Sequence, residues 1–455
     1  MKKKIAICHY RVGGTDGVSL EIEKRKQILE KHNCEVKLIA GTRSYKADYT
    51  IRELEWDSEI IPRIKENSFL SFDRKDFNDE EIKEKKKEVT DKIRKKLDEI
   101  QKKEKFNYVL VHNIFSFGGH TAAAKAFKDW IEEFKLPTIA THHDFFWERK
   151  EFHTPRNDFI KQYLKKYMPP KSPYITHVVI NSLAKRGLKE RNNIESVLIP
   201  DVFDFSQPQW AKDSFNGDFL EQFDIKPNDL IVLQATRVIP RKGIELAIDF
   251  AKRLEKKIKK LRGKKIYNNK QLGKKANIVL IIAGYTEGEK RIYMFKIKTK
   301  CFEEQVHAKF VSSSISAKRS YHNQVKTYSL WDAYVYADLV TFPSIWEGWG
   351  NQFIEGVFAK KPMVVFEYPV FKKDIKPEGY KYISLGDELL KKDENGLCKI
   401  SQKAMDEAVK KTIRWLLNKN LNRKLDLNFK IGQKNHDYKD IESFLVEKLE
   451  LDLTE

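Results

Sequence analysis

Short apolar runs alternate along this chain with segments whose apolar residues recur at helical spacing, and this pattern strongly limits the possible folds. The runs at 5–8 and 36–40 are predicted strands, and between them Val18, Ile22 and Leu29 fall on one face of a helix. Further predicted strands of this half are 108–111, 138–141 and 178–180. Such alternation predicts a doubly wound, largely parallel sheet.

The same pattern restarts after a polar stretch that runs to about residue 217 and is typical of a linker. The second set of predicted strands is 231–233, 278–283, 339–342 and 363–366, with helices at 244–254 and 351–359. We therefore predict an α/β protein with two Rossmann-like domains, 1–205 and 206–425, followed by a helical segment, 426–455. Because parallel sheets bind ligands outside the carboxyl ends of their strands, the expected site is a cleft between the domains.

The composition excludes some classes of protein and narrows the partners. Of the 455 residues 41% are hydrophobic, which excludes disorder throughout. The 87 Lys and Arg outnumber the 66 Asp and Glu and give a net charge of +21, which favours an anionic partner such as a nucleotide, a membrane surface or a nucleic acid. A nucleic-acid-binding stripe would interleave aromatic with basic residues, whereas here the aromatics lie mostly within apolar runs.

The sequence predicts a cytoplasmic protein. The apolar stretch before His9, at 5–8, is only four residues long, too short for the core of a signal peptide, and no run approaches the ~18 apolar residues of a membrane-spanning helix. Peripheral contact with the inner membrane face is compatible with this prediction. The four cysteines lie far apart without a Cys-x-x-Cys pair, which argues against a disulfide framework or a zinc ribbon.

The most informative segment is 343–355, Pro-Ser-Ile-Trp-Glu-Gly-Trp-Gly-Asn-Gln-Phe-Ile-Glu, directly after a predicted strand. Gly348 and Gly350, on either side of Trp349, expose backbone N–H groups just before a helix that Asn351 would cap. A helix N-terminus with free donors attracts phosphate. The alternative is a strand–turn–helix unit with no ligand.

Two acidic residues flank this predicted anion site. A carboxylate at Glu347 is electrostatically reasonable there only if it accepts hydrogen bonds from the hydroxyls of a sugar attached to the phosphate. Glu355, about one turn inside the helix, would reach another hydroxyl-bearing ring on the same side. The segment therefore predicts a nucleotide-sugar site.

A basic turn follows the first strand of the second half, at 235–243. Arg237 and Lys242 flank the turn and precede an amphipathic helix, so both can converge on one diphosphate. Arg241 is expected to face solvent. No Asp-x-Asp occurs in the chain, so the usual sign of a metal that holds the diphosphate is missing. We expect no metal cofactor, with the cations and the helix N-terminus neutralising the charge.

These residues carry a resemblance to a known family. Glu347 and Glu355, with seven residues between them, look like the Glu-x7-Glu signature of the retaining glycosyltransferases of family 4, which have the GT-B fold. Arg237 and Lys242 match the Arg and Lys that hold the donor diphosphate in that family. The resemblance is close over most of 231–366 and looser before it. It implies that the helix after Asp437 crosses back onto the first domain.

In the first half, Gly13-Gly14-Thr15 follows the first strand and opens a helix, which lets a backbone approach a ligand closely. The turn lacks Gly-x-Gly-x-x-Gly, so it is weak support for a nicotinamide or flavin cofactor. In the resembled family this loop lines the cleft. The resemblance thus implies that Gly14 lies near the donor phosphate and that Gly13 and Thr15 lie near the acceptor.

Polar residues also follow two other strands of the first half. His143 resembles the family's cleft histidine, which contacts the donor sugar; a one-residue slip would put His142 there instead. His112, at a second strand end, is a candidate acceptor-binding residue. Arg149 and Arg11 are candidates for holding an anionic acceptor, with solvent-facing positions as the alternative.

A metal site must be weighed at the same place because His142, His143, Asp144, Glu148 and His153 cluster in the sequence. They do not form a His-Glu-x-x-His helix, and adjacent histidines on an extended segment point in opposite directions. We therefore predict no zinc hydrolase.

The sequence predicts a hexosyltransferase that moves a hexose from a GDP- or UDP-linked donor to the hydroxyl of a sugar, a lipid or a small polyol or acid, with retention implied by the resemblance. Arg237 and Lys242 would stabilise the departing diphosphate, Glu347 would orient the sugar, and His143 would support the transition state. The alternatives are a GT-B epimerase or hydrolase, and a basic protein that binds nucleic acid or a membrane surface. The oligomeric state stays open.

Overall fold

The computed structural model describes residues 2–14, 16–41, 46–286, 291–316, 318–322 and 325–451. The chain divides into two compact units. The first comprises Met1–Val202 together with Lys439–Glu455, and the second comprises Phe203–Tyr438. The sequence predicts divisions after residues 205 and 425.

The first unit contains a parallel sheet in the order β3-β2-β1-β4-β5-β6-β7. Its strands are β1 (Lys4–His9), β2 (Glu35–Ala40), β3 (Tyr49–Thr50), β4 (Tyr108–His112), β5 (Thr138–His142), β6 (Ile175–Val179) and β7 (Val197–Leu198). Its helices are α1 (Gly17–Lys31), α2 (Ile60–Ser68), α3 (Asp79–Glu104), α4 (Thr121–Glu133), α5 (Asp158–Tyr167), α6 (Ser182–Asn192) and α14 (Tyr438–Lys448). The reversal of strand order beside β1 is that of doubly wound nucleotide-binding folds.

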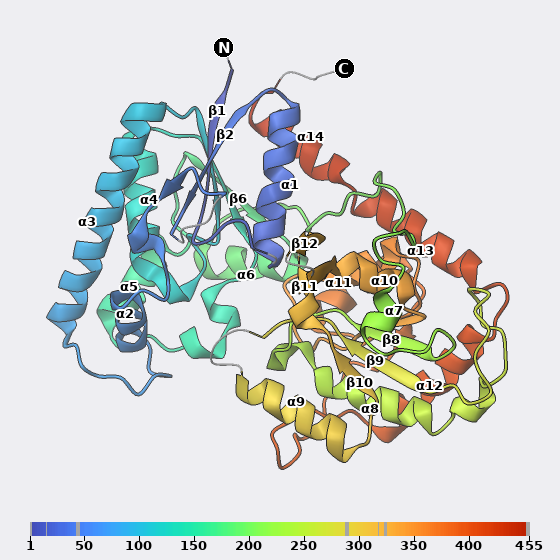
Figure 1. Ribbon diagram of the computed structural model, residues 1–455. Helices are drawn as coiled ribbons and strands as arrows, with labels where there is room; N and C mark the ends of the chain where they lie inside the picture. The colour runs from blue at the N-terminus through green and yellow to red at the C-terminus, as the bar shows by residue number, and fades with distance from the viewer. Residues whose placement is uncertain are drawn as a thin grey trace. The chain divides into compact units, whose positions relative to one another are not determined.

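Helices cover both faces of this sheet. Figure 1 shows α3 and α4 on one side of the strands and α1 on the other. Alternate residues of β1 separate the two sides: Ala6 and Cys8 pack in the same apolar core as Ile93 of α3 and Trp130 of α4. A capping box at Asn78 starts α3, which explains why so charged a helix begins there.

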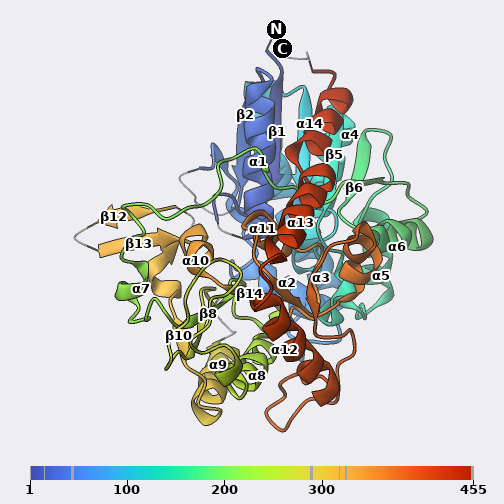
Figure 2. The ribbon, with the colours of Figure 1, turned by 90° about the vertical axis from the view of Figure 1, so that its right-hand side faces the viewer.

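The last helix of the chain lies beside the first one (Figures 1 and 2). His32 Nε2, just after α1, is 2.9 Å from Glu442 Oε1 of α14, and Lys31 Nζ is 2.9 Å from the same oxygen. At the other end Lys3 Nζ donates to the carbonyl of Leu449 at 2.7 Å. These contacts hold α14 in the first unit.

The second unit repeats the same topology, with a parallel sheet in the order β10-β9-β8-β14-β15-β16. Its strands are β8 (Leu230–Gln234), β9 (Ile278–Ile282), β10 (Ala308–Phe310), β14 (Leu339–Phe342), β15 (Met363–Val365) and β16 (Ile383–Ser384). Its helices are α7 (Phe219–Gln222), α8 (Ile244–Glu255), α9 (Arg291–Glu303), α10 (Leu330–Tyr336), α11 (Asn351–Phe358), α12 (Gln402–Leu416) and α13 (Leu421–Asn435). The prediction of two Rossmann-like α/β domains is confirmed.

Some features of the second unit differ from what the sequence suggested. Helix α13 continues through the predicted boundary at 425 and packs on α11. A small sheet of β11 (Ile315–Ser316), β13 (Val325–Ser329) and β12 (Ser320–His322) was not predicted, because its strands are short and largely without buried apolar residues. The predicted linker has no long element but is packed: Trp210 stacks on Trp331 with ring centroids 4.4 Å apart.

All four cysteines are free and buried, as the sequence predicts. Within the described ranges, no helix is both long enough and apolar enough to span a membrane.

Candidate functional site

Two loops meet at the carboxyl ends of the adjacent strands β8 and β14. The loop after β8 contains the short 3-10 helix Pro240–Lys242, and the loop after β14 leads into α11. Ile345 N donates to the carbonyl of Arg241 at 2.9 Å, which ties the loops together. Gly243 has φ +59°, and a Cβ there would also collide with the carbonyl of Pro343, so only glycine permits this approach.

The centre of this meeting point is the buried carboxylate of Glu347. Its Oε1 pairs with the Lys242 ammonium, and its Oε2 accepts from Arg241 Nη1 at 2.6 Å. Arg241 also donates to the carbonyl of Trp346 at 3.1 Å. The prediction that Arg241 faces solvent is therefore wrong. A carboxylate taken out of water needs several charged or polar partners, and one ammonium alone does not supply them.

These contacts set the charges of the group. Burial alone would raise the pKa of Glu347, but the charges of Lys242 and Arg241 outweigh it and hold the pKa at about 2. Burial lowers the pKa of Lys242 to about 8 despite its pairing with Glu347. The charges of Arg241 and Arg237 also lower it, which places Arg237 in the electrostatic surroundings of Lys242. At neutral pH the carboxylate is ionised and the group carries excess positive charge.

The start of α11 lies at the end of the same loop. Asn351 is the first helical residue and Gly350, not Asn351, is the cap. Gly350 has no side-chain oxygen to compete for the amide donors of the first turn. A Cβ on Gly350 would lie 2.5 Å from Tyr368 Oη, which donates to the carbonyl of Trp349. The close approach of Tyr368 therefore requires glycine and fixes the backbone before the helix.

Glu355 is buried one turn inside α11. Its Oε2 accepts from Tyr334 Oη of α10 at 3.1 Å. Burial raises the pKa of Tyr334, and the Glu355 charge raises it further, so the tyrosine stays protonated and donates. Trp349 is also buried and lies with its ring centroid 5.3 Å from that of His436. The structure thus groups Arg237, Lys242, Glu347, Gly348, Trp349, Gly350, Asn351 and Glu355 around the carboxyl ends of β8 and β14.

In the first unit a second group gathers after β4 and β5. His112 Nδ1 lies 3.1 Å from His143 Nε2, and the two rings stack with centroids 5.4 Å apart. On its other side His143 Nδ1 is 3.5 Å from Asp201 Oδ1. Asn113 Oδ1 accepts from the backbone N–H of His143 at 2.8 Å and fixes the loop. Sequence reasoning missed Asp201; its position just after the end of β7 was the available signal.

The two neighbouring histidines have different surroundings. His142 points away from His143 and lies with its Nε2 2.9 Å from Nδ1 of His177. Burial lowers the pKa of His142 and of His112 well below their usual range, so both are neutral at pH 7. The geometry therefore favours His143 over His142 as the polar group at this strand end.

The two arginines considered for an acceptor both have acidic partners. Arg149 Nε donates to Asp144 Oδ2 at 2.6 Å, and its guanidinium also lies over the Phe117 ring at 5.3 Å. Arg11 Nε lies 3.3 Å from Asp16 Oδ2. An acceptor that uses either guanidinium would bind beside an existing ion pair.

The glycine turn is described only in part, because Thr15 lies outside the described residues. Gly13 has φ +78°, which favours glycine, and is half-buried, whereas Gly14 is exposed. Asp16 caps α1 by accepting from Ser19 N at 3.2 Å. In the part of the chain that the structure describes, no three His, Cys, Asp or Glu side chains are arranged to hold a metal ion.

Comparison with known proteins identifies the family of this chain. The family model of the group 1 glycosyl transferases matches residues 217–430. The mannosylglucosylglycerate synthase of Petrotoga mobilis is 39% identical over 405 residues, covering 89% of this chain and 91% of the relative. That of Thermotoga maritima is 36% identical over 448 residues, covering 97% and 98%.

A solved structure supports the fold alone. The sucrose-phosphate synthase of Thermosynechococcus elongatus superposes with a TM-score of 0.61 at 12% identity, covering 99% of this chain and 98% of that one. The fold, the family model and the two relatives define the class as a GT-B glycosyltransferase. The chain belongs to the group 1 glycosyl transferases, in a family with the two mannosylglucosylglycerate synthases.

Proposed function

We propose that this chain is a retaining hexosyltransferase of family 4 that binds a nucleotide diphosphate sugar in its second unit. The observation that supports this most is the group of Lys242, Glu347 and Arg241 beside the start of α11, in which the carboxylate and the ammonium are buried. It combines excess positive charge with a carboxylate that stays ionised. A ligand that is anionic at one end and rich in hydroxyls at the other matches both properties.

The proposed chemistry follows from these charges. The bond between the anomeric carbon and the diphosphate oxygen breaks, and the acceptor oxygen forms a new bond to that carbon. Arg237 and Lys242 stabilise the negative charge that develops on the leaving diphosphate, and the amide donors around Trp349 and Gly350 add to this. The leaving oxygen takes the acceptor's proton. Glu347 orients the sugar hydroxyls, and Glu355 binds the ribose.

We propose that the acceptor is a glucosylglycerate and that the hexose is mannose. The support is the name of the two relatives, which cover nearly the whole chain. Such an acceptor carries a carboxylate, and Arg149 and Arg11 of the first unit are the cations proposed for it, with Gly13 and His112 as further proposed contacts in the same unit. We also propose that His143 supports the transition state and that Asp201 positions it.

The test is direct incubation of the purified chain with GDP-mannose, UDP-mannose, GDP-glucose or UDP-glucose, each with and without glucosylglycerate. We expect a product with one added hexose from one mannose donor, with the donor's anomeric configuration preserved in its NMR spectrum. Donor breakdown at the same rate without acceptor would instead indicate a hydrolase or an epimerase. Since protein cations neutralise the diphosphate, the rate is expected to be unchanged after treatment with EDTA.

A further inference from the structure

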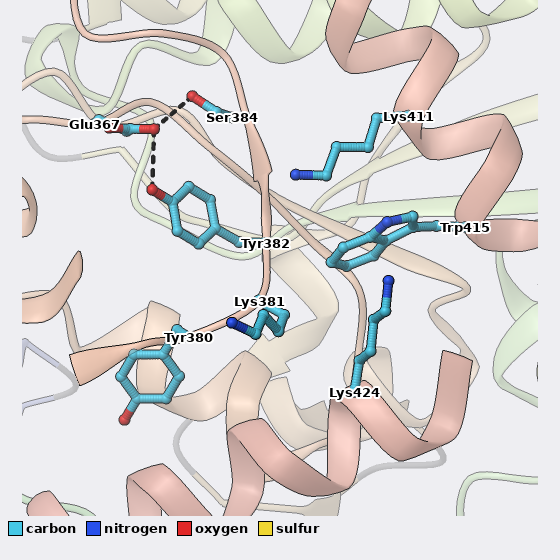
Figure 3. A pocket seen from close by; sticks show the side chains of 8 residues that line it. All are labelled: Glu367, Tyr380, Lys381, Tyr382, Ser384, Lys411, Trp415 and Lys424. Atoms are coloured by element: carbon cyan, nitrogen blue, oxygen red, sulfur yellow. Dashed lines mark hydrogen bonds between the residues drawn. The ribbon is translucent and has the colours of Figure 1, made fainter. Parts of the chain in front are cut away.

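The second unit contains a pocket that plays no part in the proposed transfer. It has a volume of about 370 Å³ and lies at β16, between this strand and the helices α12 and α13 (Figure 3). β16 is the edge strand of the sheet, whereas Lys242 and Glu347 follow the central strands β8 and β14. The pocket is therefore distinct from the proposed nucleotide-sugar site. Its size matches that of a small-molecule site.

The lining of this pocket carries excess positive charge. Lys381, Lys411 and Lys424 come from three different segments of the chain. Within the described residues, none of these ammonium groups lies within ion-pairing distance of a carboxylate. The one acidic group of the lining, Glu367, pairs with Lys376 at 2.6 Å. The lysines are therefore not balanced by the pocket itself.

Glu367 is also held by hydroxyl groups of the same pocket. It accepts from Ser384 Oγ at 2.6 Å and from Tyr382 Oη at 3.0 Å, both through Oε1 (Figure 3). Each hydroxyl still has acceptor capacity. The wall opposite the lysines therefore offers oxygen acceptors to the hydroxyl groups of a ligand.

Trp415 of α12 also lines the pocket. The ammonium groups of Lys411 and Lys424 each lie 5.3 Å from the centroid of its ring. In Figure 3 the indole projects between these two lysines toward the segment that carries Tyr382, just before β16. An indole provides apolar surface for the C–H groups of a sugar ring.

The electrostatics of Lys411 favour the binding of an anion. Burial lowers its pKa, and the charges of Lys424, Arg414 and Lys381 lower it further; only Glu367 acts in the other direction. A bound anion would offset this repulsion. Lysine is a common point-charge ligand for phosphate.

From these observations we propose that the pocket at β16 is a binding site for a small phosphorylated sugar. The phosphate contacts Lys411, and the sugar ring lies against the edge of Trp415 with its hydroxyls toward Tyr382 and Ser384. The proposal does not depend on the transferase reaction, because its residues take no part in the nucleotide-sugar site.

The test is calorimetric titration of the full chain, saturated with GDP or UDP so that phosphate cannot bind at Lys242. The probes are mannose 6-phosphate, glucose 6-phosphate, inorganic phosphate, glycerate and mannose. We expect a hexose phosphate to bind with one site per chain, more tightly than inorganic phosphate, with no binding of mannose. Lys411→Met should weaken it at least about tenfold, the size expected for one charge-assisted contact.

Lys410 is the matched control, because it is exposed and adjacent to Lys411 on the same helix. Lys410→Met should leave hexose phosphate binding unchanged, and Lys411→Met should leave the nucleotide affinity unchanged. The proposal is overturned if no hexose phosphate binds, or if both variants bind it as the original chain does. It is also overturned if inorganic phosphate or glycerate binds as tightly as the hexose phosphates.

Discussion

Glu347 and Lys242 form a buried ion pair although 105 residues separate them in the sequence. They meet because β8 and β14 are neighbours in a parallel sheet, so the loops that follow these strands leave the same edge. Burying two charges is costly unless both are well paired, and here Arg241 supplies the third charge. The group is thus assembled by the fold before any ligand binds.

Lys242→Met is expected to weaken the binding of a nucleoside diphosphate by about ten- to a hundredfold, because a charge-assisted contact to phosphate contributes roughly 1.5–3 kcal/mol. It should also lower the free energy of unfolding by about 3–5 kcal/mol, since Glu347 loses one of its two cations while buried. Titration calorimetry and urea unfolding measure the two effects.

A double variant separates affinity from stability. Lys242→Met with Glu347→Gln removes the carboxylate that has lost one of its two cations, so part of the lost stability should return while the nucleotide affinity stays low. Lys259→Met, at an exposed position, is the control and should change neither quantity. Recovery of nucleotide affinity in the double variant would contradict a direct contact between Lys242 and the diphosphate.

Nucleotide affinity should also depend on pH through Lys242. Its pKa of about 8 lies below the usual value for lysine, so the ammonium loses its proton as the pH rises through about 8. A diphosphate binds the protonated form, and its affinity should therefore fall between about pH 7 and about pH 9. In Lys242→Arg the charge persists over this range, and the affinity should be level. Equal slopes in the two proteins would show that another group titrates.

Much of this architecture is predictable from the sequence, because the buried strands are apolar runs bounded by polar turns. The loop 343–355 was predictable for the same reason, since it joins such a run to a helix. The partner of Glu347 was harder to foresee. Arg241 contacts a buried carboxylate because two loops that are more than 100 residues apart in the sequence approach each other in the fold. No local sequence pattern indicates that approach.

The site in the first unit shows the same limit. His143 was predictable as a polar residue at a strand end, but Asp201 lies after the last strand of the sheet and belongs to no motif. The pocket at β16 was missed entirely, because its lysines look like ordinary surface residues in a chain with 87 Lys and Arg.

His143→Asn is expected to lower kcat for hexosyl transfer by about a hundredfold, the effect of losing one polar group that acts on the transition state. The affinity for the nucleoside diphosphate should stay within about twofold, because the cations proposed to bind the diphosphate belong to the second unit. Asp201→Asn should give a smaller fall in kcat, since it removes only the partner of His143.

His153 provides a control for these variants because it is an exposed histidine of the same segment. His153→Asn should leave kcat and KM unchanged. If His143→Asn raises KM for the donor while kcat stays the same, the histidine binds the ground state and the assigned role is wrong.

Gly350→Ala is expected to weaken nucleotide binding without any loss of charge. The added Cβ would lie 2.5 Å from Tyr368 Oη, so either the tyrosine or the backbone before α11 must move. Moving that backbone displaces the amide donors proposed for the diphosphate, and about tenfold weaker binding is expected from the loss of one such contact.

Tyr368→Phe removes the oxygen that collides, so the double variant should bind the nucleotide more tightly than Gly350→Ala alone. Gly187→Ala, where the nearest heavy atom would be 3.6 Å from the Cβ, is the control. Failure of Tyr368→Phe to restore any affinity would mean that the loop is not held in place by this contact.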